Sequence, residues 1–86
     1  MNLLFRPKAW EHFQFWQETD KATVKKINAL IKECLRHPYE GTGKPEPLNG
    51  DLRGYWSRRI DREHRLVYRV VSDDLEILSC RYHYQS

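Results

Sequence analysis

Two stretches in the first half of the chain repeat apolar residues at the spacing of a helix. The first follows Pro7, and its apolar positions are Ala9, Phe13 and Trp16. Three or four positions separate these residues, so they share one face and predict a helix from Lys8 to Glu18. Pro7 suits the first turn of this helix, because a first turn needs no N–H bond from that position.

A second helix is predicted directly afterwards, with Thr19 or Asp20 as its N-cap. Its apolar stripe consists of Val24, Ile27, Ile31, Cys34 and Leu35, and its basic face of Lys21, Lys25, Lys32 and Arg36. The pair His37-Pro38 ends this helix, because proline disfavours helical geometry in the residue before it. The two helices are therefore expected to form a hairpin with one apolar side.

The hydrophobic spacing is strand-like at the start of the chain and in its second half. Strands are predicted at residues 3–5 ("LLF"), 55–60 ("YWSRRI"), 64–71 ("HRLVYRVV") and 75–84 ("LEILSCRYHY"). In the third of these runs, Leu66 and Tyr68 face one way while Arg65, Val67 and Arg69 face the other. The last three runs predict an antiparallel meander, one face of which meets the helices while the other keeps its arginines.

The length of 86 residues suits one compact domain, and we expect residues 1–86 to form it. No run approaches the ~18 apolar residues that a membrane-spanning helix needs. The first ten residues, "MNLLFRPKAW", also lack the long apolar stretch and the small-residue cleavage site of a signal peptide. We therefore expect a cytoplasmic protein with no membrane partner, in which Cys34 and Cys80 stay reduced.

The formal net charge is +3, and the two kinds of basic residue are unevenly distributed. All six lysines precede residue 45, whereas every basic residue after it is an arginine. The guanidinium group is a planar fork that matches phosphate oxygens, so the second half favours an anionic partner such as nucleic acid. The alternative is that these arginines only solvate exposed strand faces.

Glu46 and His83 are the candidate catalytic side chains. Glu46 lies between two prolines in "KPEPL", so a stiff loop aims its carboxylate, although most loop carboxylates are simply solvated. His83 lies late in the last predicted strand, and imidazole is the side chain that changes charge near neutral pH. A base, an acid and a guanidinium are what RNA cleavage by the 2′-hydroxyl requires, and no metal is needed for that route. Tyr84 is a candidate for orienting the phosphate or stacking on a base.

A zinc site is the rival use of His83. Cys34-x-x-His37 and Cys80-x-x-His83 together contain the two Cys and two His of a structural zinc centre. However, Cys34 falls on the apolar stripe of the second helix, and Cys80 and His83 alternate across a strand. We therefore expect neither a metal nor another cofactor.

Four long segments resemble the YoeB (Txe/YoeB) toxins, which lie within the RelE/ParE superfamily of bacterial toxin-antitoxin systems. They are "WQETDKATVKKINALIKE", "GKPEPL", "GYWSRRIDREHRLVY" and "CRYHY". The resemblance runs nearly from end to end of the chain. It implies an α+β fold in which an N-terminal helical hairpin packs on a twisted antiparallel sheet, as in RelE. It also implies a ribosome-dependent messenger-RNA endonuclease of the bacterial cytoplasm that a cognate antitoxin inhibits.

The resemblance assigns roles to individual residues. Glu46 resembles the general base of the family, His83 its general acid, Arg65 the arginine that stabilises the transition-state phosphate, and Tyr84 the near-terminal aromatic that orients the substrate. The implied RNA contacts are Lys44, Arg58 and Arg59, with Arg59 favoured by its place in "WSRRI". The implied partners are an antitoxin whose flexible segment covers the basic cleft, the ribosome and messenger RNA. A homodimer of the isolated chain is left open.

The chain departs from the family pattern in two places, and two other functions remain to be weighed. Asn49, with Asp51 nearby, stands where a basic residue often follows "PEPL", which weakens the phosphate-binding charge of that loop. Gln85 and Ser86 extend the chain beyond the usual terminal aromatic. A ParE-like inhibitor of gyrase without enzymatic activity is the first alternative, because one fold supports several functions. A structural RNA-binding module is the second, but it gives Glu46 no task.

Overall fold

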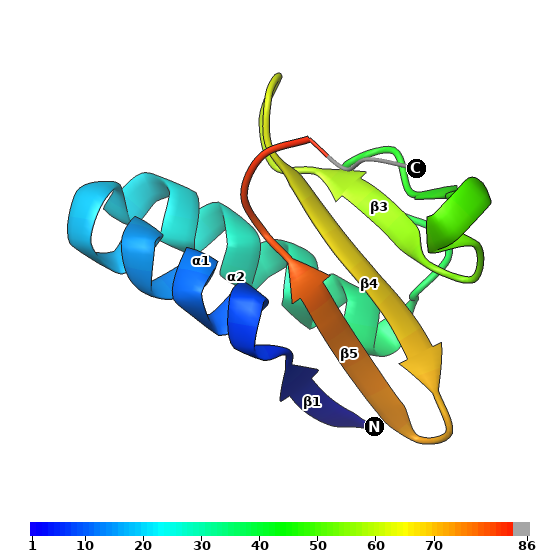
Figure 1. Cartoon of the computed structure of the whole chain (residues 1–86). Coiled ribbons are helices and arrows are strands. Elements are labelled where there is room, and N and C mark those ends of the chain that lie inside the picture. Colours follow the sequence, from blue (N-terminus) through cyan, green and yellow to red (C-terminus); the bar gives the residue numbers. More distant parts are fainter. Residues whose placement is uncertain (84–86) are drawn as a thin grey trace.

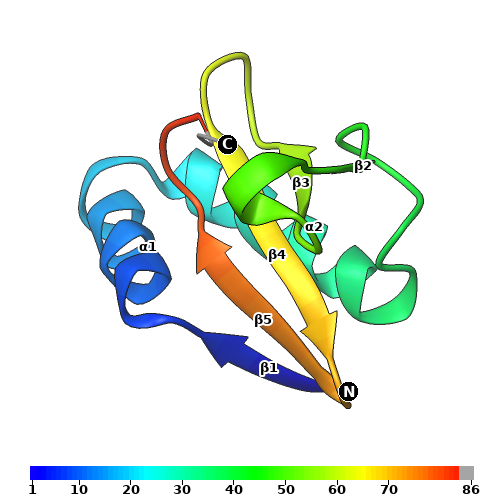
Figure 2. The same ribbon diagram turned by 45° about the vertical axis from the view of Figure 1, so that its right-hand side comes forward.

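A computed structural model describes residues 1–83 of the chain (Figure 1). Its strands are β1 (Asn2–Phe5), β2 (Glu46–Pro47), β3 (Trp56–Arg59), β4 (Arg65–Val71) and β5 (Asp74–Ser79). Its helices are α1 (Pro7–Thr19), α2 (Lys21–Arg36) and a short 3₁₀ helix, η1 (Gly50–Leu52). The predicted α+β architecture is confirmed, with α1 and α2 side by side against one face of the sheet (Figures 1 and 2). No helix within residues 1–83 is both long and apolar enough to cross a membrane.

The five strands form one mixed sheet in the order β1-β5-β4-β3-β2. Strands β3, β4 and β5 form the predicted antiparallel meander, and β2, which lies in the segment predicted as a loop, also pairs antiparallel with β3. Strand β1 differs, because it pairs parallel with β5 and places Leu3 opposite Leu75. A parallel neighbour needs a long connection, and both helices and three strands separate β1 from β5 in the chain. The sheet is therefore mixed rather than wholly antiparallel.

The helices begin and end within one residue of the predicted bounds: α1 was predicted from Lys8 to Glu18 and spans Pro7–Thr19. Pro7 occupies the first turn of α1. The Asp20 carboxylate caps α2 by accepting hydrogen bonds from the backbone N–H of Thr23 at 3.2 Å and from its hydroxyl at 2.9 Å. Helix α2 ends at Arg36, and His37 is its C-cap residue. The hairpin therefore has a defined corner at Asp20 and a defined exit into the loop that follows Pro38.

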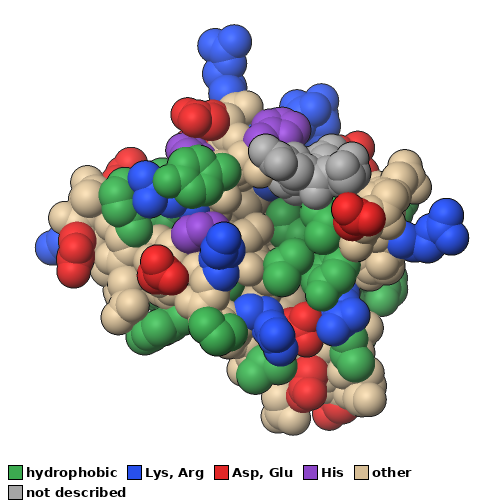
Figure 3. Space-filling model, in the orientation of Figure 1, with side chains coloured by type: hydrophobic (Ala, Val, Ile, Leu, Met, Phe, Trp, Pro, Cys, Tyr) green, Lys and Arg blue, Asp and Glu red, His purple; other side chains and the backbone are tan. Residues whose placement is uncertain are grey.

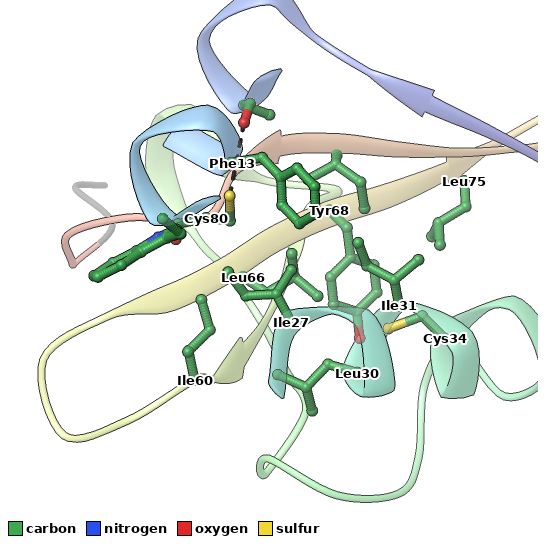
Figure 4. Packing of buried hydrophobic residues seen from close by; sticks show 13 residues of the cluster. Phe13, Ile27, Leu30, Ile31, Cys34, Ile60, Leu66, Tyr68, Leu75 and Cys80 are labelled. Atoms are coloured by element: carbon green, nitrogen blue, oxygen red, sulfur yellow. Dashed lines mark hydrogen bonds between the residues drawn. The ribbon is translucent and has the colours of Figure 1, made fainter. Parts of the chain in front are cut away.

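The core lies between the helices and one face of the sheet (Figure 4). Leu66 and Tyr68 of β4 are fully buried there, as the period-two pattern predicted. They pack with Phe13 of α1 and with Ile27 and Leu30 of α2. The predicted stripe omitted Leu30, which is only 1% exposed. The helices α1 and α2 cover this face only, and the opposite face of the sheet is here called the open face (Figure 3). Its central residues Ser57 and Val67 are nevertheless buried, at 2% and 1% exposed.

The last strand is shorter than predicted, so His83 lies beyond the sheet. Strand β5 ends at Ser79, and Leu78 is an extra residue opposite the step from Val67 to Tyr68. Such a bulge bends a strand, and bulges are frequent beside functional sites. The chain then leaves the sheet and turns back toward the connection between β3 and β4, in red in Figure 2.

Candidate active site

Glu46 lies on the open face of the sheet. It sits in β2, where it pairs with Ser57 of β3, and Ser57 in turn pairs with Val67 of β4. Cross-strand partners point to the same face, so Glu46 shares the face of Val67, opposite to that of Leu66. Two strand spacings, roughly 10 Å, separate the backbones of Glu46 and Val67. The flanking prolines were expected to aim this carboxylate, but the pairing with β3 was not expected.

Arg65 is the first residue of β4 and occupies the same face. Its side chain is largely buried, because the residue is only 9% exposed. Its Nη1 donates to the carbonyl oxygens of Asp61 at 2.9 Å and of His64 at 3.1 Å, which fixes the guanidinium against the turn between β3 and β4. Its backbone N–H donates to the carbonyl of Tyr82 at 3.1 Å. This last bond joins the start of β4 to the residue directly before His83.

His83 is exposed and lines a cavity of about 490 Å³ on the open face. Val67 and Ser79, which are paired across β4 and β5, line the same cavity. Figure 3 shows hydrophobic side chains on this face bordered by histidine and by Lys and Arg groups. Glu46 and Arg65 therefore share the face of the sheet on which this cavity lies, although neither of them is among the described residues that line it. Tyr84 lies outside the described residues.

Two of the three predicted RNA contacts are exposed beside this face. Arg59 ends β3 and stands opposite Arg65 of β4. Like charges at directly opposed positions repel each other, and an anion between them would relieve that repulsion. Lys44 lies in the loop before β2 and has a left-handed φ of +51°. Arg59 also fixes this loop, because its backbone N–H donates to the carbonyl of Gly43 at 2.7 Å.

Arg58 does not lie at the surface as expected. Its side chain is 0% exposed, and it shares the helix-facing side of β3 with Trp56. All five of its N–H groups are used: Nε donates to the hydroxyl of Tyr68, Nη1 to Glu33 Oε1 and the Thr42 carbonyl, and Nη2 to the carbonyls of His37 and Glu40. A guanidinium with no exposed surface and no spare donor cannot contact RNA without breaking these bonds. The expectation of an RNA contact at Arg58 is therefore corrected to a structural role.

Arg58 holds the loop that leads from α2 to Glu46. Its Nη1 lies 2.8 Å from Glu33 Oε1, and the same carboxylate accepts from the backbone N–H of Thr42 at 2.6 Å. These bonds, led by the one from Thr42, lower the pKa of Glu33 below its usual value. Gly41 has a φ of +121°, and a Cβ there would overlap Glu33 Oε1. The loop is thus pinned to the inner side of β3 just before the chain crosses to Glu46.

Alternation in the sequence carried the signal for this role. Trp56, Arg58 and Ile60 fall on one side of the predicted strand, which is the side that meets the helices. An arginine at such a position needs an internal set of acceptors. Arginine is usually exposed to solvent, so the residue type favoured a surface position for Arg58. The period-two alternation of the strand instead indicated that its side chain is buried.

The cysteines and histidines of the rejected zinc set lie apart. Cys34 belongs to α2 and is buried in the core, and the Cys80 thiol donates to the carbonyl of Ala9 on α1 at 3.6 Å. Both thiols are free and buried. Within residues 1–83, no group of three or more His, Cys, Asp or Glu side chains is placed to hold a metal ion.

The sequence matches a known family over most of its length. The model of the YoeB-like toxins of bacterial type II toxin-antitoxin systems matches residues 5–84. The toxin YoeB of Escherichia coli is 58% identical over 84 residues, which cover 98% of this chain and 100% of that protein.

Solved structures of similar sequence share the fold. The YoeB/ParE toxin from Agrobacterium tumefaciens is 52% identical and superposes with a TM-score of 0.95, covering 98% of this chain and 100% of that one. The toxin in a heterotetrameric YoeB-YefM toxin-antitoxin complex from Staphylococcus aureus is 50% identical, with a TM-score of 0.89 and 98% of each chain covered. A YoeB dimer from the same organism is also 50% identical, with a TM-score of 0.90 and the same coverage. On this evidence the chain belongs to the YoeB-like toxins of bacterial type II toxin-antitoxin systems.

Proposed function

We propose that this toxin is a ribosome-dependent endonuclease that cleaves messenger RNA in the bacterial cytoplasm by acid-base catalysis. Glu46 removes the proton from a 2′-hydroxyl, and the 2′-oxygen then attacks the adjacent phosphorus. The bond from phosphorus to the 5′-oxygen breaks, and His83 donates its proton to that oxygen. The products are a 2′,3′-cyclic phosphate and a 5′-hydroxyl, so atoms and charges balance without a metal.

Arg65 stabilises the charge that develops on the phosphate in this reaction. Its guanidinium is held by backbone carbonyls, so little reorganisation is needed when the charge appears. Arg59 and Lys44 contact flanking phosphates of the RNA, and Tyr84 orients the substrate. Two observations support this proposal: Glu46 and Arg65, from distant parts of the sequence, share one face of the sheet, and His83 lines a cavity bordered by Val67 of that face.

The ribosome supplies what this small face lacks. In-line attack needs the 2′-oxygen, the phosphorus and the leaving oxygen to be aligned, and such positioning contributes a large share of a rate enhancement. A chain of 86 residues offers little surface for holding an RNA strand in that geometry. A messenger strand held by the ribosome arrives with its alignment already set.

An antitoxin is the proposed protein partner. The Staphylococcus aureus relative forms a heterotetramer with YefM, which supports a partner of the same kind for this chain. An acidic flexible segment that folds over the open face would pair with Arg59 and Lys44 and exclude RNA. The dimer of the same relative supports a homodimer of this chain in the absence of antitoxin.

The test is cleavage of messenger RNA in a translating extract by the unaltered chain and by two variants. Glu46→Ala and His83→Ala should each slow cleavage by ~10²–10⁴-fold, the usual contribution of a general base or acid. Matched controls are Glu18→Ala and His37→Ala, which remove an exposed side chain of the same type outside the proposed site. Undiminished cleavage by both variants would reject these roles, and gyrase inhibition without new RNA ends would favour the ParE-like alternative.

A further inference from the structure

Two imidazoles hold the segment that carries His83. The backbone N–H of Cys80 donates to Nδ1 of His12 on α1, at 3.2 Å. The backbone N–H of Tyr82 donates to Nδ1 of His64, in the turn between β3 and β4, at 2.7 Å. Residues 80–83 are here called the C-terminal segment. Strand β5 ends at Ser79, and beyond it α1 and the turn between β3 and β4 each supply one imidazole acceptor to a backbone N–H of this segment.

The chemistry of the donors fixes the protonation state of both rings. A backbone N–H only donates, so the nitrogen that faces it must present a lone pair. Nδ1 of His12 and Nδ1 of His64 are therefore unprotonated, and each neutral ring carries its proton on Nε2. Protonation at Nδ1 would replace each acceptor with a second donor, which faces the amide and repels it.

The C-terminal segment depends on these bonds because its backbone is strained. Tyr82 has a φ of +68°, a left-handed conformation that an aromatic residue adopts at an energetic cost. Two further bonds hold its carbonyls: Trp16 Nε1 donates to Cys80 at 2.8 Å, and the Arg65 N–H donates to Tyr82 at 3.1 Å. Removing the imidazole acceptors leaves the half-buried Cys80 N–H and the exposed Tyr82 N–H without these partners.

The charges around His12 disfavour its protonated form. Burial is the main cause that lowers the pKa of His12 below its ordinary 6.5, and the neighbouring cations Lys8 and Arg81 lower it further. Glu11 acts in the opposite direction, and His64 adds a smaller lowering effect. At neutral pH the ring is therefore held in the neutral form that its bond to Cys80 requires.

His64 sits among different neighbours. Its own turn contributes Glu63, with Oε1 at 3.6 Å from Nε2, and the Asp61 carboxylate, which accepts from the His64 backbone N–H at 2.7 Å. Helix α1 contributes the Trp16 ring, which meets the imidazole edge-on with centroids 4.9 Å apart. The C-terminal segment contributes the Tyr82 ring at 6.2 Å. The carboxylates lie on the Nε2 and backbone sides, so they leave Nδ1 to the Tyr82 amide.

We propose that His12 and His64 are positioning residues whose Nδ1 acceptors dock the C-terminal segment, and that protonation of His12 releases it together with His83. The consequence for catalysis rests on the proposed function, in which His83 is the general acid. In the docked state His12 binds its proton more weakly than in a released state. The released state therefore binds more protons as the pH falls, and docking is progressively lost from about pH 6.5 downwards.

Amide hydrogen exchange measured by NMR tests docking without any RNA. Between pH 7.5 and pH 5.5, protection of the Cys80 and Tyr82 amides, corrected for the intrinsic pH effect, should fall by roughly three- to tenfold per lost hydrogen bond. The amides of β4 serve as the internal reference for global stability. Constant corrected protection across this range would overturn the proposal.

Asparagine variants separate the acceptor from the titration. Asn places an uncharged Oδ1 acceptor close to the position of Nδ1 and does not titrate. The double variant His12→Asn, His64→Asn should therefore keep protection at pH 7.5 and lose its dependence on pH. His64→Leu, which removes the acceptor, should expose the Tyr82 amide at every pH. His37→Asn is the matched control, because the His37 side chain is exposed and should change nothing.

The dependence of cleavage on pH then links docking to activity. The double Asn variant should retain cleavage to lower pH than the unaltered chain, because its segment stays docked when His12 of the unaltered chain is charged. Exchange that responds to pH while neither protein cleaves RNA would reject the proposed function and leave docking intact. RNA cleavage together with amide protection that changes neither with pH nor in the His64→Leu variant would reject docking. The proposed function would then remain intact.

Discussion

The two ends of the proposed site are held in different ways. Before Glu46, the loop from α2 is pinned by Arg58, a buried guanidinium with five hydrogen bonds. Before His83, the C-terminal segment is pinned by two neutral imidazoles. A guanidinium stays charged at every pH that a protein survives, whereas an imidazole changes charge between pH 5 and 8. The segment before the base is thus held until Glu33 is protonated in strong acid, whereas the segment before the acid is held only while His12 remains neutral.

Arg58 is here called the anchor on the Glu46 side, and His12 and His64 the anchor on the His83 side. The largest expected effect comes from removing the Arg58 anchor. Arg58→Met should lower the free energy of unfolding by about 3 kcal/mol or more, because it leaves the Tyr68 hydroxyl and several loop carbonyls without their donor. Arg58→Lys should also destabilise, by about 2 kcal/mol, since one ammonium cannot reach the acceptors of a planar fork. Urea unfolding measures both.

The matched control for this anchor is the neighbouring arginine. Arg59→Lys makes the same chemical change one residue along β3 at an exposed position, so it should alter stability by no more than about 0.5 kcal/mol. Equal losses in the free energy of unfolding for Arg58→Lys and Arg59→Lys would show that burial of the Arg58 guanidinium adds no stability. Arg58 would then not be the anchor of the loop before Glu46.

A smaller effect separates the two anchors by pH. The pKa of Glu33 is lowered in the folded chain, so its stabilising contribution is present above its ordinary value of 4.5 and is lost as the pH falls through the folded value. The Arg58 anchor should therefore weaken only in strong acid, whereas the C-terminal segment loosens below about pH 6.5. Glu33→Gln should flatten the acid limb of stability below pH 4.5 and leave the range from pH 5.5 to 7.5 unchanged.

The smallest expected effect uses the cysteines, because one is buried beside each anchor. Cys34 lies near Arg58 and Tyr68, and burial raises the pKa of its thiol. Cys80 belongs to the C-terminal segment, and burial raises the pKa of its thiol to about 12. Both are labelled with a methanethiosulfonate reagent, which reacts with the thiolate. Because both thiol pKa values lie well above this pH range, the ratio of the two labelling rates cancels the dependence of thiol ionisation on pH. The ratio of Cys80 to Cys34 labelling should rise roughly three- to tenfold from pH 7.5 to 5.5, in line with one lost hydrogen bond.

A constant ratio would mean that both regions open together. In that case pH would act on the whole fold, and the imidazoles would not form a separate device. The His12→Asn, His64→Asn double variant provides the comparison, since its ratio should stay constant while its core remains as stable as that of the unaltered chain.

Local patterns predicted much of the fold, because they determine which residues share a face. The spacing of Ala9, Phe13 and Trp16 predicted a helix, and all three residues are buried on α1. The alternation around Leu66 and Tyr68 predicted the face of β4 that meets the helices. Pairing partners that are distant in the sequence were not predictable in this way, and the parallel partner of β1 was missed for that reason.

The parts of the site that the sequence did not predict depend on contacts between distant residues. The alternating pattern runs from β5 into the C-terminal segment, and nothing local indicates that His12 and His64 take over its amides after Ser79. The sequence did indicate burial of Arg58 through its position in β3, but that signal conflicted with the usual exposure of arginine. At Arg58, the period-two alternation of the strand predicted burial and the residue type predicted exposure, and the structure agrees with the alternation.

Glu46 and His83 are proposed to act on opposite oxygens of one phosphodiester, and one substrate separates their two roles. A messenger bound to purified ribosomes can carry sulfur in place of the 5′-oxygen at the cut, and a thiolate leaves without needing a proton. We predict that this substrate restores cleavage by His83→Ala close to that of the unaltered chain, but does not restore cleavage by Glu46→Ala. Equal restoration of both variants, or of neither, would contradict the assigned roles.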